Sequence, residues 1–251
     1  MSIAFDHFVL LVNDLDAAAR DFEALGFTVL ERADTSHGTT IFKFVSFADG
    51  SYILLTAFTS DEGRKGHRLG TVLDAGEGWA DYSFVVPDAT AAGTALVSAG
   101  FAARGPVSVS NVLAGGEKWG LDLLMTGRGA GGDAALPFLI SDVEGRGHRI
   151  PGPSTHANGA TGIASVTVSS ANPRRVADTL VAIGGKDVAT PHAIRVHFGA
   201  EFVEILTLEA APNGRPGGGI VSVTLKGGAA GQALDLTLAH NAPMVFSEGQ
   251  A

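Results

Sequence analysis

Short apolar strands alternate with compact helical segments along most of the chain. Residues 8–12 form an apolar run, and after an acidic turn residues 14–26 carry a helical pattern. Asp before such a helix is typical of an N-cap, and Gly after it is typical of a helix end. Residues 28–58 then alternate as three strands, with a hairpin turn at residues 48–50. The first 60 residues are therefore predicted to form one β-α-β-β-β unit.

The same pattern occurs twice more. Residues 82–101 match residues 8–27 without a gap, again with Asp before the helix and Gly after it. A third copy starts at residue 163, and its helix opens with Asn172-Pro173, a pair that fits an N-cap followed by Pro in the first turn. Strands are also expected at residues 121–125, as the last strand of the second unit, and at 192–198, 201–208, 220–225, 233–238 and 244–246.

These elements predict an α+β fold of repeated β-α-β-β-β units that form half-open, mixed β-sheet barrels. Residues 1–140 would hold two units, at about 5–60 and 79–140. Residues 141–162 would be a connector within a Gly- and Pro-rich stretch, since long loops in compact domains are usually functional or connecting. Residues 163–251 would hold the third unit and a degenerate fourth unit that lacks its helix.

Composition narrows the functional classes. The 251 residues are 45% hydrophobic and 17% charged, which is typical of a folded globular protein, and there is no cysteine for disulfide or thiolate chemistry. A net charge of −9 with scattered basic residues argues against nucleic acid as a partner. No apolar run approaches the roughly 18 residues of a membrane span, and no secretory signal is visible at the N-terminus. We expect a cytoplasmic protein that binds a small molecule, with a homodimer left open.

The repeat and its motifs resemble the vicinal oxygen chelate superfamily, and in particular its glyoxalase-like proteins of the Glyoxalase_3 type. The resemblance spans most of residues 5–208. It implies a half-open barrel around one divalent metal ion of undetermined type, no organic cofactor, and lyase, isomerase or dioxygenase chemistry on a small oxygenated substrate. The segments that carry it are Asp6-His7-Phe8-Val9-Leu10, Asp14-Leu15-Asp16, Leu25-Gly26-Phe27, Gly38-Thr39-Thr40, Pro137-Phe138-Leu139-Ile140 and His156-Ala157-Asn158-Gly159.

In the superfamily the metal ligands come from the first strand, as His or Gln, and from the last strand, as Glu. Mapped onto this chain, the resemblance implies His7 and Glu204 as metal ligands, with Glu204 doubling as the catalytic base. Leu54 and Ser165 stand at the other expected ligand positions, and neither suits a metal. A catalytic metal site generally needs three or more protein ligands, so the set is incomplete.

Each candidate residue also has a structural interpretation. His7 fits a polar residue at a strand end equally well, whereas Glu204 lies on a strand with apolar residues on both faces and needs a partner if buried. His37 and Thr39, before a strand, and His156 and Asn158, in the connector, are candidates for substrate binding. Turn formation by Asn158-Gly159 is an equally good explanation of that motif.

Two functions therefore remain open from the sequence. One is a metal-dependent enzyme, and the other is a binding or sequestering protein that has lost its metal. The pairing of the units is also open. Pairing of the first unit with the second would place Asp81 near His7, whereas pairing of the first with the third would place Glu204 there.

Overall fold

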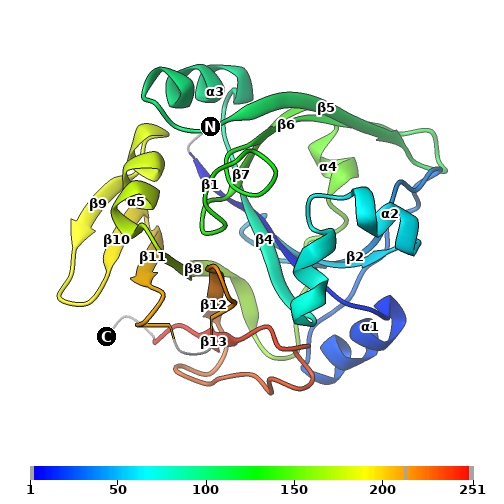
Figure 1. Ribbon diagram of the computed structural model, residues 1–251. Helices are drawn as coiled ribbons and strands as arrows, with labels where there is room; N and C mark the ends of the chain where they lie inside the picture. Colours follow the sequence, from blue (N-terminus) through cyan, green and yellow to red (C-terminus); the bar gives the residue numbers. More distant parts are fainter. Residues whose placement is uncertain (1–2, 212–213, 249–251) are drawn as a thin grey trace.

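The computed structural model describes residues 3–211 and 214–248, which form two β-sheets and short helices (Figure 1). The first sheet contains β1 (Ala4–Leu11), β2 (Thr40–Ser46), β3 (Tyr52–Phe58), β4 (Gly78–Val85), β5 (Arg104–Val112), β6 (Lys118–Met125) and β7 (Phe138–Glu144). The second contains β8 (Ala160–Ser170), β9 (Lys186–Ala189), β10 (Ile194–Phe198), β11 (Glu201–Thr207), β12 (Gly219–Gly227) and β13 (Met244–Phe246). The helices are α1 (Leu15–Ala24), α2 (Asp61–Gly66), the 3-10 helix η1 (Gly70–Ala75), α3 (Ala89–Ser98), α4 (Arg146–Arg149) and α5 (Pro173–Ala182).

The order of the strands shows which units pair. The first sheet has the order β2-β3-β1-β4-β7-β6-β5, and the second has β13-β12-β8-β11-β10-β9. β1 pairs antiparallel with β4, so the first unit joins the second, while β8 pairs antiparallel with β12 and joins the third unit to the tail. The predicted α+β fold of repeated units is confirmed, and the first unit pairs with the second.

The helices begin and end largely where the sequence predicts. The Asp14 side chain accepts hydrogen bonds from the backbone N–H groups of Asp16 and Ala17 at 3.0 and 2.9 Å, which caps α1. Gly26 ends this segment with φ +84°, and a Cβ there would lie 3.0 Å from Asn158, so both conformation and space favour glycine. Asn172 occupies the predicted N-cap position of α5, and Pro173 lies in the first turn, but the Asn172 side chain makes no capping hydrogen bond.

The expected strands differ from the observed ones mainly at sheet edges. Residues 28–32 and 233–238 form only isolated bridges, at Leu30 and Ala233. β5 and β9 were not predicted, because both are edge strands with mostly exposed side chains and therefore lack a clear apolar alternation.

The second unit ends one strand later than predicted. Residues 121–125 lie in β6, and β7 follows as the last strand of the unit. The predicted boundary at residue 140 therefore falls inside β7, and the start of the expected connector forms the end of β7 and helix α4. The second half of β7 is polar and partly exposed, which is why its sequence carries no strand signal.

Alternation along β1 divides the first sheet into two faces. Phe8 and Leu10 belong to the large core that reaches the second sheet, where the rings of Phe84 and Phe198 lie 4.5 Å apart. Val9 and Leu11 belong to a smaller apolar cluster on the opposite face. None of the helices in the described ranges is long and apolar enough to cross a bilayer.

Residues 30–35 bring the two edges of the first sheet together. Leu30 pairs with Phe44 on β2, and Asp34 pairs with Leu113 just beyond β5. The backbone N–H of Thr35 also donates to the carbonyl of Val112 at 3.2 Å. The first and second units thus form a barrel that is bridged at one end, and the smaller cluster faces its interior.

Candidate functional site

The barrel of the first two units contains a partly open cavity of about 200 Å³. Its walls are mostly aliphatic and aromatic side chains from the strands, and residues 67–69, between α2 and η1, also line it. A dry apolar cavity of roughly 150 Å³ holds benzene, so this space accommodates a molecule with one ring and a short side arm. The polar groups on its wall include His7, Arg32, Arg68 and Arg149, and no Asp or Glu of the described residues lines it.

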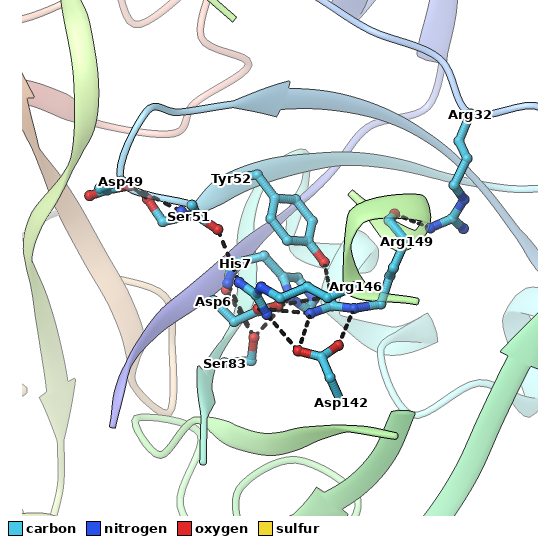
Figure 2. Close-up of polar contacts among 11 residues, drawn as sticks. Asp6, His7, Arg32, Asp49, Ser51, Tyr52, Ser83, Asp142, Arg146 and Arg149 are labelled. Atoms are coloured by element: carbon cyan, nitrogen blue, oxygen red, sulfur yellow. Dashed lines mark hydrogen bonds and ion pairs between the residues drawn. The ribbon is translucent and has the colours of Figure 1, made fainter. Parts of the chain in front are cut away.

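A buried ionic network lies beside this cavity, between the start of β1 and helix α4 (Figure 2). Arg149 is 2% exposed, and its guanidinium donates to Asp6 Oδ1 at 2.9 Å, to Asp142 Oδ1 at 2.8 Å and to Tyr52 Oη at 2.7 Å. Arg146 Nη1 donates to both carboxylates, at 2.7 Å each. Two arginines thus neutralise two aspartates, which is the condition under which buried charges are tolerated.

The network fixes the charge of Asp6. Burial alone would raise the pKa of this carboxyl, but the charge of Arg149 and the hydrogen bond from His7 outweigh burial and hold the pKa well below its usual range. Asp6 is therefore a carboxylate at neutral pH, and it can accept hydrogen bonds only.

This carboxylate sets the tautomer of His7. His7 Nδ1 lies 2.7 Å from Asp6 Oδ2 and 2.9 Å from Ser83 Oγ, so Nδ1 carries the proton and Nε2 is left as an acceptor. Among the described residues Nε2 has no hydrogen-bond partner, and His7 lines the cavity. The ring stacks on Tyr52 with centroids 4.8 Å apart.

We expect His7 to be neutral at pH 7. Burial lowers its pKa from 6.5 and outweighs the opposite effect of the Asp6 hydrogen bond. Because the folded state disfavours protonation, this histidine should favour folding fully above pH 6.5 and progressively less as the pH falls below it. A long-range ¹⁵N–¹H NMR titration should show a protonated Nδ1 at pH 7 and a midpoint below 6.5. A midpoint at or above 6.5 would contradict the assignment.

The other cavity arginines lie against aromatic rings. The Arg32 guanidinium carbon is 4.5 Å from the centroid of Trp119, and Nε donates to Asp34 Oδ1 at 2.8 Å. The Arg68 guanidinium carbon is 4.9 Å from the centroid of Phe138, and Nη1 donates to Asp81 Oδ2. Both carboxylates stand behind the cavity wall, which leaves aromatic and cationic groups on its surface.

The side chains at the expected ligand positions do not fit a divalent metal. The register supports the mapping, since Tyr52 lies opposite His7 in the first sheet as Phe202 lies opposite Ser165 in the second. Leu54, at the position of the expected carboxylate, is apolar and lines the cavity. Asp81, which the paired unit supplies opposite Val9 on β1, is held by Arg68. No cluster of three or more His, Cys, Asp or Glu that could hold a metal occurs in residues 3–211 and 214–248.

The structure separates the two implied metal ligands. His7 lies on β1 in the first sheet, whereas Glu204 lies on β11 in the second. Glu204 Oε1 accepts from Arg195 Nε at 2.8 Å, and Oε2 lies 3.5 Å from Thr167 Oγ1. The partner that a part-buried Glu204 needs is therefore an arginine on the neighbouring strand, so the pair of His7 and Glu204 gains no support as a metal or catalytic site.

The four candidate substrate-binding residues do not line the cavity. His37 and Thr39 are exposed on the loop before β2. His156 is 4% exposed, accepts from the backbone N–H of Thr28 at 3.0 Å, and packs edge-on against Phe27 and Phe47. Asn158 Nδ2 donates to the carbonyl of Leu25 at 2.9 Å. His156 and Asn158 thus fasten the connector to the end of α1.

The paired β-α-β-β-β units and their barrel define a fold of the glyoxalase and vicinal oxygen chelate type. The sequence model described as a glyoxalase-like domain, Glyoxalase_3, matches residues 5–184, so the chain belongs to the family of glyoxalase-like domain proteins. A search of curated proteins found no match.

Solved structures share the fold at low sequence identity. A hypothetical protein from Staphylococcus aureus is 16% identical with a TM-score of 0.73, covering 98% of this chain and 99% of its own. A mutant of 4-hydroxymandelate synthase from Streptomyces coelicolor is 15% identical with a TM-score of 0.55, covering 90% of this chain and 71% of its own. The Mn(II)-bound glyoxalase from Novosphingobium aromaticivorans is 10% identical with a TM-score of 0.50. The match covers 88% of this chain and 64% of the glyoxalase chain.

Proposed function

We propose that the barrel of the first two units binds a small, mostly apolar molecule directly through its side chains, without the divalent metal that the fold implies. The observation that carries the proposal is the cavity of about 200 Å³, whose wall is mainly apolar with a few cationic groups. Small-molecule sites are typically concave and apolar, with few polar groups that orient the ligand.

The residues at the ligand positions support binding without a metal. Leu54 offers no donor atom, and the carboxylates of Asp6 and Asp81 are already paired with arginines. A metal would have to replace a guanidinium at either carboxylate, which would leave a buried arginine without its partner. The metal-dependent lyase, isomerase or dioxygenase chemistry of the superfamily is therefore the less favoured function. That alternative would act through His7, whose Nε2 has no hydrogen-bond partner among the described residues.

Metal analysis tests the proposal. Protein purified without chelators should carry substoichiometric manganese, iron, nickel and zinc. A ligand that binds only the folded state raises its stability, so addition of these ions should leave the midpoint of thermal unfolding unchanged. His7→Ala and the exposed control His37→Ala should have equal metal contents. One tightly held ion per chain that is lost in His7→Ala but kept in His37→Ala would overturn the proposal.

A further inference from the structure

The cavity arginines differ in how many of their hydrogen-bond donors have a partner among the described residues. Arg149 has no guanidinium nitrogen left for a ligand, because each of the three donates to Asp6, Asp142 or Tyr52. Arg32 donates through Nε to Asp34 and through Nη1 to the carbonyl of Arg149. Arg68 differs, because only Nη1 has a partner among the described residues, namely Asp81.

The free atoms of Arg68 form one edge of the guanidinium. Nε and one hydrogen of Nη2 point in parallel and match the two oxygens of a carboxylate, a bidentate arrangement that is stronger and more selective than a single hydrogen bond. The side chain is 16% exposed and lies over the ring of Phe138, which limits the directions in which this edge can turn.

The carboxylate that already pairs with Arg68 does not line the cavity. Asp81 is 2% exposed, does not line the cavity, and uses Oδ1 to accept from the backbone N–H of Tyr82 at 2.9 Å. The cavity surface therefore combines cationic donors with apolar walls, and no Asp or Glu of the described residues lines it. An anionic group is stabilised on such a surface, and a cationic group is repelled.

We infer that the ligand is a small carboxylic acid with an apolar body of about one ring, whose carboxylate pairs with the Nε–Nη2 edge of Arg68. This inference rests on the proposed function and adds to it the chemical class of the ligand. Arg68 is then the residue that determines specificity, while the ring occupies the apolar space between the strands.

Titration with three matched probes tests the inference. Phenylacetate, phenylacetamide and phenethylamine have similar size and differ in the charge of the polar group. Trp119 lines the cavity, whereas Trp79 does not, so tryptophan fluorescence of a Trp79→Phe background reports on binding. Phenylacetate should bind about 10- to 100-fold more tightly than phenylacetamide, as expected for a charge-assisted hydrogen bond, and phenethylamine should bind least.

Variants of Arg68 distinguish loss of the ion pair with the ligand carboxylate from loss of folding. Arg68→Lys keeps the charge but removes the bidentate edge, and should reduce the preference for phenylacetate over phenylacetamide about tenfold while leaving phenylacetamide binding unchanged. The double variant Arg68→Leu, Asp81→Asn removes both charges, so no buried carboxylate is left unpaired, and should abolish the preference. Lys65→Gln removes one positive charge from the exposed surface of α2 and should change nothing.

The outcomes are distinguishable. Equal binding of phenylacetate and phenylacetamide to the wild-type barrel would overturn the inference and leave the proposed function standing. Undiminished preference in Arg68→Lys and in the double variant would overturn the role of Arg68. Absence of binding by all three probes would overturn both the inference and the proposed function.

Discussion

Replacement of Arg149 with Met should lower the free energy of unfolding by about 3–5 kcal/mol, the usual cost of breaking a buried ion pair from one side. Arg149 is 2% exposed and is bound by two carboxylates and a tyrosine hydroxyl from three separate strands. In Arg149→Met, Asp6 and Asp142 would stay buried with Arg146 as their remaining cationic partner. Urea unfolding monitored by circular dichroism measures the change.

A surface pair provides the control for this variant. Arg174 is also held by two aspartates, Asp178 and Asp187, but its side chain is 56% exposed. Exposed ion pairs typically contribute about 0–1 kcal/mol, so Arg174→Met should be nearly neutral. An equal loss of unfolding free energy in Arg149→Met and Arg174→Met would mean that the buried network does not stabilise the packing of β1, β3 and β7.

Replacement of Leu54 with Trp should weaken ligand binding by at least about tenfold. Leu54 lies on β3 and lines the cavity, so a larger ring there would occupy space that the ligand needs. Forcing extra side-chain atoms into space that is already filled typically costs about 1–3 kcal/mol, which corresponds to about 10- to 100-fold in affinity. Isothermal titration calorimetry with phenylacetate measures the effect.

The matched control for Leu54→Trp is a residue away from the barrel. Leu236 is 48% exposed and does not line the cavity, so Leu236→Trp should leave affinity unchanged. Thermal unfolding should show that both variants remain folded. Unchanged affinity in a folded Leu54→Trp variant would place the ligand somewhere other than this cavity.

Much of the fold was predictable because each unit is encoded locally. A strand, a capped helix and a closing glycine follow one another within about 20 residues, and the repeat made the pattern firm. The strand register supports the mapping of Ser165 onto His7, since Tyr52 lies opposite His7 as Phe202 lies opposite Ser165.

The pairing of units was not predictable, because it depends on contacts between strands that are far apart in sequence. β1 contacts β4 rather than β8, and this choice alone decides which side chains share a cavity with His7. The network around Asp6 depends on Arg149, which is 143 residues away, and no pattern in the sequence links the two residues.

The partner of Glu204 could have been predicted from the sequence by pairing residues across the β10–β11 hairpin. A two-residue turn between the predicted strands 192–198 and 201–208 places Arg195 opposite Glu204, and the two residues form an ion pair in the structure. A part-buried carboxylate needs a partner, and the neighbouring strand supplies one. The requirement for a partner therefore did not indicate a metal site.

The central claim is that the first barrel binds its ligand without a metal ion. Its most direct test is calorimetric titration of phenylacetate into protein dialysed against EDTA, compared with the same protein supplemented with Mn²⁺. The account predicts the same dissociation constant and a stoichiometry of one under both conditions. Binding that disappears after EDTA treatment and returns with Mn²⁺ would contradict it.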